Sequence, residues 1–414
     1  MSERIRMEKQ TVIKGQKELK RGYTTGTCAA AAARAAAIML FSGEEIREVR
    51  ITVPAGETLL LEVEEIVRHS DAVSCAVRKD AGDDPDITHG MLVFAEVKKE
   101  SDKRQKTDSE PEANPVQIVL EGGEGIGRVT KPGLEQPVGA PAINKVPRKM
   151  ITEALRQAAG EAGFCGTLKV TISAPEGEAL AQKTFNPRLG IVGGLSILGT
   201  TGIVEPMSEQ ALTETILLEM KVQKQEGIQT LCLVPGNYGS DFLKDELSFS
   251  PDRAVKCSNY VGEALDMAVV LGFPRVLLVG HIGKFAKLAA GVMNTHSRIA
   301  DARAEVFLAA LSHLAAGALK EDPGRMEKLI GLVPEIEESV TTDEMLAVLT
   351  RAGIREAVMS RIMERISWYL NQRTRGEVQV ELLTFSKEWG ILGKTEGAME
   401  LLEQIKEERK GQKE

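Results

Sequence analysis

A histidine and a lysine directly follow a predicted buried strand, in a setting that is typical of ligand sites. The continuous apolar run 276–279 predicts a strand buried on both faces, and the turn 280–283, which contains His281, leads from it to Lys284. Ligands of open α/β sheets bind beyond the carboxyl ends of the strands, where helix N-termini present unpaired N–H groups. Because imidazole titrates near neutral pH, His281 is our candidate to accept or relay a proton.

Glycine-rich turns follow three segments that we expect to be strands of one sheet. The segments are 191–198, 228–234 and 276–279, and the turns after them are 199–202, 235–239 and 280–283. The carboxyl ends of parallel strands meet at one edge of a sheet, so we expect the three turns to line one crevice. Each turn alone is explained more simply by a backbone that needs glycine at positive φ, so the hypothesis depends on their shared location.

Two phosphate-binding motifs are excluded at these turns. The segment 280–285 has too short a glycine spacing for a P-loop, and Phe285 stands where that motif needs a magnesium-binding hydroxyl. The segment 193–199 does not read Gly-x-Gly-x-x-Gly, so the dinucleotide signature is absent as well.

Two further polar clusters allow either a binding or a purely structural interpretation. Thr27 is a suitable N-cap for the alanine-rich helix that follows it, and Thr24 and Thr25 would offer hydroxyls to an anion. A capped helix packed on a sheet explains the same residues. The second cluster is either a solvated helical face or part of the site, and it comprises Asn294, His296, Arg298, Asp301 and Arg303. We interpret His313, which stands among leucines, as structural.

The composition favours a two-domain protein without a nucleic-acid or membrane role. A chain of 414 residues exceeds what one hydrophobic core usually organises, and a net charge of −8 argues against binding of nucleic acid. The apolar segment 28–41 contains Arg34 and is shorter than a membrane span. Five widely spaced cysteines without a Cys-x-x-Cys pair suggest neither disulfides nor a metal site, so we expect a reducing cytoplasm.

We predict an N-terminal α+β sandwich domain at residues 1–186 and a C-terminal Rossmann-like α/β domain with a mainly parallel sheet at 187–414. In the first domain, strand-like runs alternate with one or two helices, and the hydrophilic segment 99–115 indicates a mobile insertion. In the second domain, strands and helices alternate, as βαβ units do. Its part beyond residue 320 is mostly helical, and the alternating segment 378–385 is expected to rejoin the sheet.

Five segments, spread over both predicted domains, resemble a known enzyme family. They read RGYTTGTCAAAAARAA, GGLSILGTTGIVEPMS, VPGNYG, KCSNYVGEALD and GHIGKFAKLAAGVMNTHSRIADARAE. In this order they are similar to the CbiD-type cobalt-precorrin-5B (C1)-methyltransferases of anaerobic cobalamin biosynthesis. The resemblance implies a cytoplasmic enzyme that transfers the methyl group of S-adenosylmethionine to carbon 1 of a cobalt-containing corrin precursor, giving cobalt-precorrin-6A. Homo-oligomerisation and transient contacts with other enzymes of the pathway are further expectations.

The resemblance also suggests which residues would hold the donor and the substrate. We expect Glu205 to accept a ribose hydrogen bond and Tyr238 to face the adenine. The proposed cofactor-binding residues are Gly193, Gly194, Gly199, Thr200, Thr201, Gly202, Glu205, Pro235, Gly236, Asn237 and Tyr238. Substrate carboxylates require cationic and N–H donors, and the cationic candidates near the crevice are Lys256, Lys284, Lys287, Arg298 and Arg303. The proposed substrate-binding residues are Lys256, Asn259, Lys284, Asn294, His296, Arg298 and Arg303, with Thr24, Thr25 and Thr27 if the first domain closes over the crevice.

Two other functional classes stay open on the sequence alone. One is an enzyme whose glycine turns hold a nucleotide phosphate, and the other is a corrinoid carrier without chemistry. Positioning of donor and acceptor contributes roughly 7–11 kcal/mol to a displacement reaction, so methyl transfer requires neither a nucleophilic triad nor a protein-bound metal. We therefore expect no metal site in the protein itself, because the cobalt arrives inside the substrate.

Overall fold

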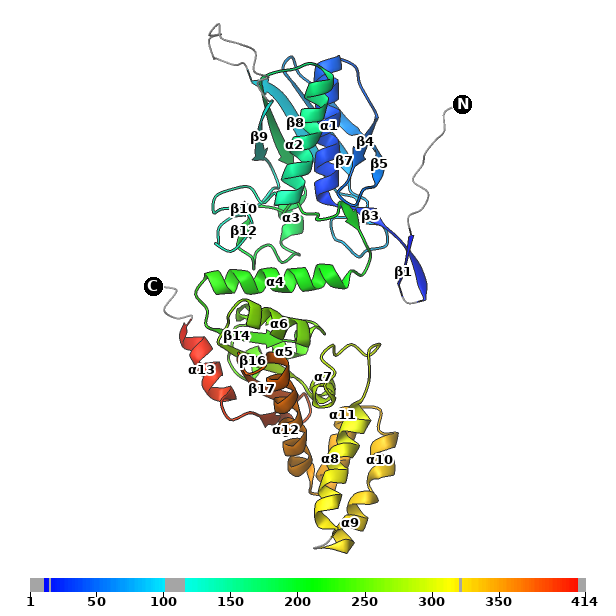
Figure 1. Cartoon of the computed structure of the whole chain (residues 1–414), viewed down its shortest axis with the longest axis vertical. Helices are drawn as coiled ribbons and strands as arrows, with labels where there is room; N and C mark the ends of the chain where they lie inside the picture. The colour runs from blue at the N-terminus through cyan, green and yellow to red at the C-terminus, as the bar shows by residue number, and fades with distance from the viewer. Residues whose placement is uncertain (1–10, 15, 101–115, 320–321, 409–414) are drawn as a thin grey trace. The chain divides into compact units, whose positions relative to one another are not determined.

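The computed structural model describes residues 11–14, 16–100, 116–319 and 322–408, and the chain divides into two compact units. Unit 1 is Met1–Glu209 and unit 2 is Gln210–Glu414. Each unit combines helices with strands, so the chain is a mixed α/β protein (Figure 1). The predicted insertion at 99–115 lies, from residue 101 onward, outside the described residues.

Unit 1 is built on a five-stranded sheet with the strand order β6-β7-β8-β11-β9. Its strands are β6 (Glu64–Arg68), β7 (Ala72–Arg78), β8 (Leu92–Glu100), β9 (Gln117–Gly122) and β11 (Thr167–Ser173). Neighbours run antiparallel, except that β9 pairs with β11 in parallel. Alternate residues of β11, namely Leu168, Val170 and Ile172, are fully buried, as expected for a strand with one face on the core.

Two long helices cover that sheet. α1 (Thr25–Ser42) and α2 (Lys145–Glu161) contact each other, and α1 also packs on β7 and β8 (Figure 1). The small side chains of Ala29 to Ala33 are fully buried, which allows α1 to approach the sheet closely. By length and composition α1 would also pass as a membrane span, but 72% of its apolar window is buried inside the protein. We therefore interpret α1 as a core helix. The short helix α3 (Gly177–Ala181) follows β11.

Four short strand pairs complete unit 1. They are β1 (Thr11–Lys14) with β2 (Lys17–Lys20), β3 (Gly22–Tyr23) with β13 (Ile203–Val204), β4 (Glu48–Thr52) with β5 (Thr58–Glu62), and β10 (Arg128–Val129) with β12 (Ile191–Val192).

The segment 191–204 corrects two predictions. A strand over 191–198 in the sheet of the second domain is wrong, because only Ile191–Val192 forms a strand and its partner β10 belongs to unit 1. The pairing of β13 with β3 likewise ties the chain after residue 200 to unit 1. The boundary between units therefore follows Glu209, and the predicted boundary after Asn186 falls inside unit 1.

Unit 2 contains a second five-stranded sheet, in the order β15-β14-β16-β17-β18. The strands are β14 (Thr230–Val234), β15 (Ala254–Lys256), β16 (Arg275–His281), β17 (Gln379–Ser386) and β18 (Gly390–Lys394). β14 is parallel to β15 and β16, β17 is parallel to β16, and β18 is antiparallel at the edge. The prediction that segment 378–385 rejoins the sheet is confirmed by the pairing of β17 with β16.

Helices cover both faces of this sheet, which explains the continuous apolar run of β16. Val276 and Leu278 belong to one core cluster, with α6 (Val261–Val270) and α12 (Arg355–Thr374). Leu277 and Val279 belong to another, with α5 (Asn237–Asp245) and α13 (Ala398–Glu408). Successive side chains of a strand point to opposite faces, so a strand between two helical layers needs apolar residues at every position.

The remaining elements of unit 2 are mainly helical. They are α4 (Glu209–Gln225), which begins at the boundary, η1 (Pro251–Arg253), α7 (Ile282–Phe285), η2 (Ala286–Ala290), α8 (Arg303–Ala318), α9 (Pro323–Ile330), α10 (Val333–Glu338) and α11 (Thr342–Arg351). α7 and η2 follow β16 directly, and so they carry the end of the glycine turn 280–283 and the residues after it.

Candidate functional site

The turns after β14 and β16 contact each other at the carboxyl end of the unit 2 sheet. The two strands are parallel neighbours, so both turns emerge at the same edge. Lys284 Nζ donates a hydrogen bond of 2.6 Å to the carbonyl oxygen of Pro235, and the rings of Tyr238 and His281 have centroids 5.9 Å apart. Two of the three predicted turns are therefore brought together.

The first of these turns is open rather than packed. Gly236 has φ +125°, a backbone conformation that favours glycine. A Cβ atom at Gly236 would meet only Lys284 Nζ, at 3.8 Å. The side chain of Tyr238 is 56% exposed, and the Lys387 ammonium lies 4.0 Å from the centroid of its ring. An open glycine turn beside an exposed aromatic ring suits a flat group or a cation.

His281 serves as a helix cap, and this fixes the position of its hydrogen. Its Nδ1 accepts a hydrogen bond of 3.0 Å from the backbone N–H of Gly283 at the start of α7. A neutral imidazole has one donor and one acceptor nitrogen, so this bond assigns the hydrogen to Nε2. Burial lowers the pKa of His281 below its usual value, although the nearby carboxylate of Asp343 acts in the opposite direction. Neutral His281 therefore offers a donor and would accept a proton only by releasing Gly283.

A cavity of about 300 Å³ lies beside this edge. It is lined by Asn259, Gly283, Lys284, Lys287, Thr295, His296, Ser297 and Arg303. Four of the predicted substrate-binding residues, Asn259, Lys284, His296 and Arg303, thus line one cavity. The cavity lies within unit 2 and is lined by α7, η2, the segment that precedes α6, the loop that precedes α8 and the first residue of α8.

The other predicted substrate-binding residues of unit 2 support this region rather than line the cavity. Lys256 Nζ donates to Asn237 Oδ1 at 3.1 Å, beside the open turn. Asn294 Oδ1 accepts the backbone N–H of His296 at 3.1 Å, and His296 Nδ1 accepts the backbone N–H of Arg298 at 3.0 Å. These two bonds shape the loop that carries Thr295 and Ser297 into the cavity.

Positive charge dominates the cavity. Burial lowers the pKa of both Lys284 and Lys287, because the charged form loses hydration. Neither lysine forms an ion pair with any part of the chain that the structure describes. Arg303 alone is neutralised, since its guanidinium holds the carboxylate of Asp301 with two hydrogen bonds. The chemistry of the lining therefore fits an anion.

The third predicted turn, 199–202, lies in unit 1, so the prediction that three turns share one sheet is wrong. Thr25 Oγ1 accepts the backbone N–H of Leu198 at 3.0 Å. Thr27 Oγ1, which is fully buried, donates to the carbonyl oxygen of Gly202 at 2.7 Å. Thr24, rather than Thr27, is the N-cap of α1, and its Oγ1 accepts the N–H of Thr27. The hydroxyls of Thr25 and Thr27 thus hold the segment 198–202 of the same unit, and that of Thr24 caps α1.

Close packing requires glycine at three positions of this segment, 194, 199 and 202. A Cβ at Gly199 would lie 2.2 Å from Thr24 Oγ1, and one at Gly202 would lie 2.5 Å from Val53 Cβ. A Cβ at Gly194 would lie 2.2 Å from the carbonyl oxygen of Gly125, whereas Gly193 faces open space. Thr200 is exposed, Thr201 Oγ1 donates to the carbonyl oxygen of Ile203, and Glu205 lies 4.0 Å from the Arg21 guanidinium.

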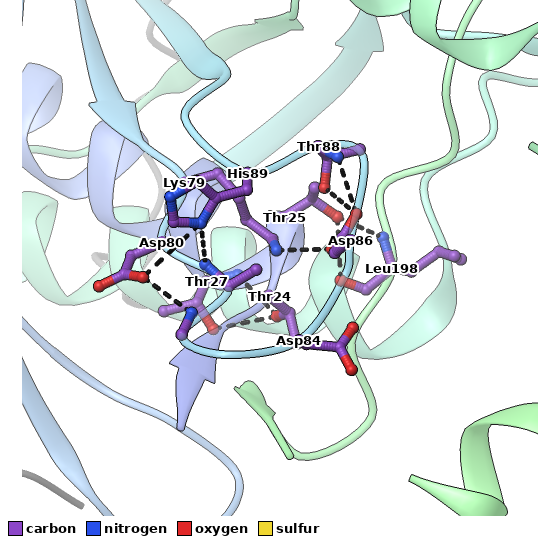
Figure 2. Close-up of polar contacts among 12 residues, drawn as sticks. Thr24, Thr25, Thr27, Lys79, Asp80, Asp84, Asp86, Thr88, His89 and Leu198 are labelled. Carbon is purple, nitrogen blue, oxygen red and sulfur yellow. Dashed lines mark hydrogen bonds and ion pairs between the residues drawn. The ribbon is translucent and has the colours of Figure 1, made fainter. Parts of the chain in front are cut away.

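The sequence interpretation missed a polar loop of unit 1 between β7 and β8, which we call the aspartate loop (residues 79–90). Figure 2 shows that it lies beside Thr24, Thr25, Thr27 and Leu198. Lys79 is 2% exposed, and its Nζ donates to Asp86 Oδ2 at 2.8 Å. The run KDAGDDPDITHG, with four aspartates between two apolar strands, is the sequence signal that would have identified it.

The carboxylates of the aspartate loop are occupied by internal bonds. Asp80 binds Lys20 Nζ, Asp83 accepts the N–H of Lys20, and Asp84 accepts the N–H of Met207. Asp86 also accepts both the N–H and the hydroxyl of Thr88. Across the described ranges, no group of three or more His, Cys, Asp or Glu side chains is arranged to hold a metal ion. The loop therefore fastens segments of unit 1 to one another.

Comparison with known proteins shows one consistent family. The CbiD family model matches residues 12–206, and the model of the CbiD C-terminal domain matches residues 326–396. A cobalt-precorrin-5B C(1)-methyltransferase of Ruminiclostridium cellulolyticum is 44% identical over 97% of this chain and 99% of its own length. One of Clostridioides difficile is 39% identical over 96% of this chain and 99% of its own length.

A solved structure is also similar. The crystal structure of a cobalamin biosynthesis protein, CbiD, from Archaeoglobus fulgidus matches with 27% sequence identity and a TM-score of 0.38. The match covers 71% of this chain and 86% of that chain.

Proposed function

The chain belongs to the CbiD family, and from this premise we propose that it transfers a methyl group to carbon 1 of cobalt-precorrin-5B in cobalamin biosynthesis, giving cobalt-precorrin-6A. The observation that carries the proposal is identity of 39–44% over nearly the full length of relatives with that activity in their names. The function expected from the quoted sequence segments agrees with it.

We propose S-adenosylmethionine as the methyl donor and unit 2 as a Rossmann-like domain that holds it. The residues that fit this role are Pro235, Gly236, Asn237 and Tyr238, because their turn is open, has backbone at positive φ and ends in an exposed ring. When bound, the donor supplies an electrophilic methyl group. A contribution from the unit 1 segment stays a prediction, and it concerns Gly193, Gly194, Gly199, Thr200, Thr201, Gly202 and Glu205. The close packing around Gly194, Gly199 and Gly202 leaves less room for the donor there than at the open turn of unit 2.

For the substrate, we propose that cationic and N–H-donating side chains beside the same edge bind its carboxylates. Lys284, His296 and Arg303 line the cavity, and Lys256 lies at the neighbouring strand end. An ammonium or guanidinium bonds a carboxylate about twice as strongly as two neutral groups bond each other. Asn259, Asn294 and Arg298 would support this contact, and Thr24, Thr25 and Thr27 stay predictions, since each hydroxyl already has a partner within unit 1.

The role proposed for His281 follows from its hydrogen-bonding pattern. Because Nδ1 accepts the Gly283 N–H, the ring hydrogen is on Nε2, which can donate it to a ligand. We propose that His281 orients an acceptor atom of donor or substrate through Nε2–H. Proton relay through Nδ1 would cost the cap of α7.

Two competing functions are distinguished by one titration series. Calorimetry with S-adenosylmethionine, with magnesium–ATP and with a cobalt tetrapyrrole separates the methyltransferase, a phosphate-using enzyme and a corrinoid carrier. The proposal requires binding of S-adenosylmethionine and of the tetrapyrrole. Binding of the tetrapyrrole alone would favour the carrier, and binding of ATP alone would favour the phosphate-using enzyme. We also propose a cytoplasmic location, self-association and transient contacts with neighbouring enzymes, which size measurements on cell extracts would test.

A further inference from the structure

One lysine of the cavity is buried to a degree that surface lysines do not reach. Lys287, on η2, is 4% exposed. Its Nζ donates to two backbone carbonyl oxygens, that of Ala300 at 2.9 Å and that of Thr295 at 3.3 Å. An ammonium has three N–H donors, so one is left for the cavity that Lys287 lines. Carbonyl dipoles compensate only part of the lost hydration, and no carboxylate lies within 4.0 Å of this ammonium among residues 11–14, 16–100, 116–319 and 322–408.

The rest of the lining strengthens this positive charge. Lys284 contributes a second ammonium, which donates a hydrogen bond to the carbonyl oxygen of Pro235. The neighbouring acid, Asp301, is already held by Arg303. Asn259, Thr295 and Ser297 add polar groups at the wall. The site therefore offers one buried cation, a second cation and neutral hydrogen-bonding groups, which is the composition of a carboxylate site.

The size of the cavity limits what it can hold. Its volume of about 300 Å³ is at the lower end of the range for drug-sized ligands, and a tetrapyrrole is larger than such ligands. The cavity cannot enclose the macrocycle, but it has room for a single chain that ends in a carboxylate. Under the proposed function, two molecules carry such a group: the corrin precursor, on its peripheral side chains, and S-adenosylmethionine, at its amino-acid end.

We propose that this cavity is a carboxylate-binding subsite anchored by the buried ammonium of Lys287. The inference rests on the proposed function for the source of the carboxylate, but not for the existence of the subsite. Lys287 binds one carboxylate oxygen through its remaining N–H while its other two bonds hold the loop 294–302 in place. Lys284 contributes to the field that attracts the anion.

The test removes the charge of Lys287 while keeping a donor for the loop. Lys287→Gln retains a neutral N–H group for the two carbonyls, Lys287→Arg retains the charge, and Lys244→Gln removes an exposed charge from α5 of the same unit. We expect Lys287→Gln to weaken binding of one carboxylate-bearing ligand roughly ten- to hundredfold, as loss of a charged hydrogen bond does. Lys287→Arg should stay much closer to the wild type, and Lys244→Gln should match it.

Three measurements separate the outcomes. The dissociation constants of S-adenosylmethionine and of cobalt-precorrin-5B identify the source: weakening of the first assigns the amino-acid end of the donor, and weakening of the second assigns a side chain of the macrocycle. Propionate, followed by saturation-transfer NMR, probes the subsite itself and should bind the wild type but not Lys287→Gln. Propionate binding without any binding of S-adenosylmethionine would contradict the proposed function and leave the subsite standing. Unchanged binding of all three ligands in a folded Lys287→Gln variant would overturn the inference.

Discussion

Replacing Asp86 with Asn should destabilise unit 1 by about 3 kcal/mol, the lower end of the usual cost of breaking a buried ion pair, because the side chain of Lys79 is buried but that of Asp86 is 27% exposed. Lys79 is 2% exposed, and its ammonium lies 2.8 Å from Asp86 Oδ2 (Figure 2). The amide introduced by Asp86→Asn would keep an acceptor for Thr88, so the main loss is the charge opposite Lys79. The free energy of unfolding is measured by urea titration followed by circular dichroism, with hydrogen exchange of β7 and β8 as the local readout.

The effect of Asp86→Asn should depend on pH in a defined direction. Burial opposes ionisation of Asp86, but the Lys79 ammonium and the hydrogen bonds from Thr88 offset it and hold the pKa of that carboxyl below its usual value. A depressed folded pKa contributes stability above the unfolded pKa of about 3.9, and this stability is lost as the pH falls through the folded pKa. The difference between wild type and variant should therefore be constant from about pH 7 to 5 and shrink below about pH 4.

Glu64→Gln is the matched control, because the Glu64 side chain (30% exposed) is about as accessible as that of Asp86 (27%), whereas its partner Arg78 is 52% exposed and Lys79 only 2%. Loss of this pair should cost less than about 1 kcal/mol. A cost for Asp86→Asn as small as that of the control, or a difference that persists unchanged to pH 3, would refute the assignment of Lys79 and Asp86 as a buried stabilising pair.

Three further predictions concern single residues, one in unit 1 and two at the carboxyl end of the unit 2 sheet. Gly199→Ala should destabilise unit 1 by about 2–4 kcal/mol in urea unfolding, because residue 199 has φ +140° and its new Cβ would lie 2.2 Å from Thr24 Oγ1. Gly139→Ala is the control: its φ is also positive, but its Cβ would meet open space, so it should cost distinctly less. Equal costs for the two variants would contradict the packing argument. Lys387→Met should strengthen binding of S-adenosylmethionine about two- to fivefold, because the Lys387 ammonium over Tyr238 competes with the sulfonium for the ring. S-adenosylhomocysteine, whose sulfur is uncharged, should bind as before. Equal changes for both ligands in calorimetry would count against a cation site at this ring. His281→Asn keeps a cap acceptor for Gly283 but loses the ring Nε2–H that orients an acceptor atom of the ligand, so kcat should fall about 100-fold. Any acidic limb of the wild-type pH profile that is due to His281 should lie below pH 6.5, because burial lowers its pKa, and it should vanish in the variant. Unchanged kcat would remove His281 from the mechanism.

Local pattern predicts three of the five strands of the unit 2 sheet, β14, β16 and β17, because each carries its own apolar signal, but it predicts neither the three-residue β15 nor β18. The apolar residues 276–279 alternate between two helical layers, and so a continuous apolar run is what this strand requires. The segment 191–198 misled for the opposite reason. Leu195 and Ile197 are buried, and their backbones form isolated β-bridges with Ile126 and Ile143, which lie far away in the sequence. Apolar spacing alone does not distinguish such bridges from a strand of the following sheet.

The candidate site could be predicted only in part. Asn259, Lys284, His296 and Arg303 are expected at the site from the sequence, and they line one cavity. The helical face expected over 294–303 is wrong, because residues 291–302 form a loop between η2 and α8. The burial of Lys287 and Lys79 depends on tertiary packing, which residue type does not reveal, since lysine is usually exposed. The prediction of Thr27 as the cap of α1 is wrong, since Thr24 caps the helix. Several threonines close together satisfy the same preference.

The most direct test of the account is the fate of a labelled methyl group. Purified protein is incubated with cobalt-precorrin-5B and S-adenosylmethionine that carries a carbon-13 methyl group, and the product is analysed by NMR. The account predicts one labelled methyl group, attached to carbon 1 of the macrocycle, with formation of S-adenosylhomocysteine. Label at another carbon, or no transfer by a protein that binds both ligands, would contradict it.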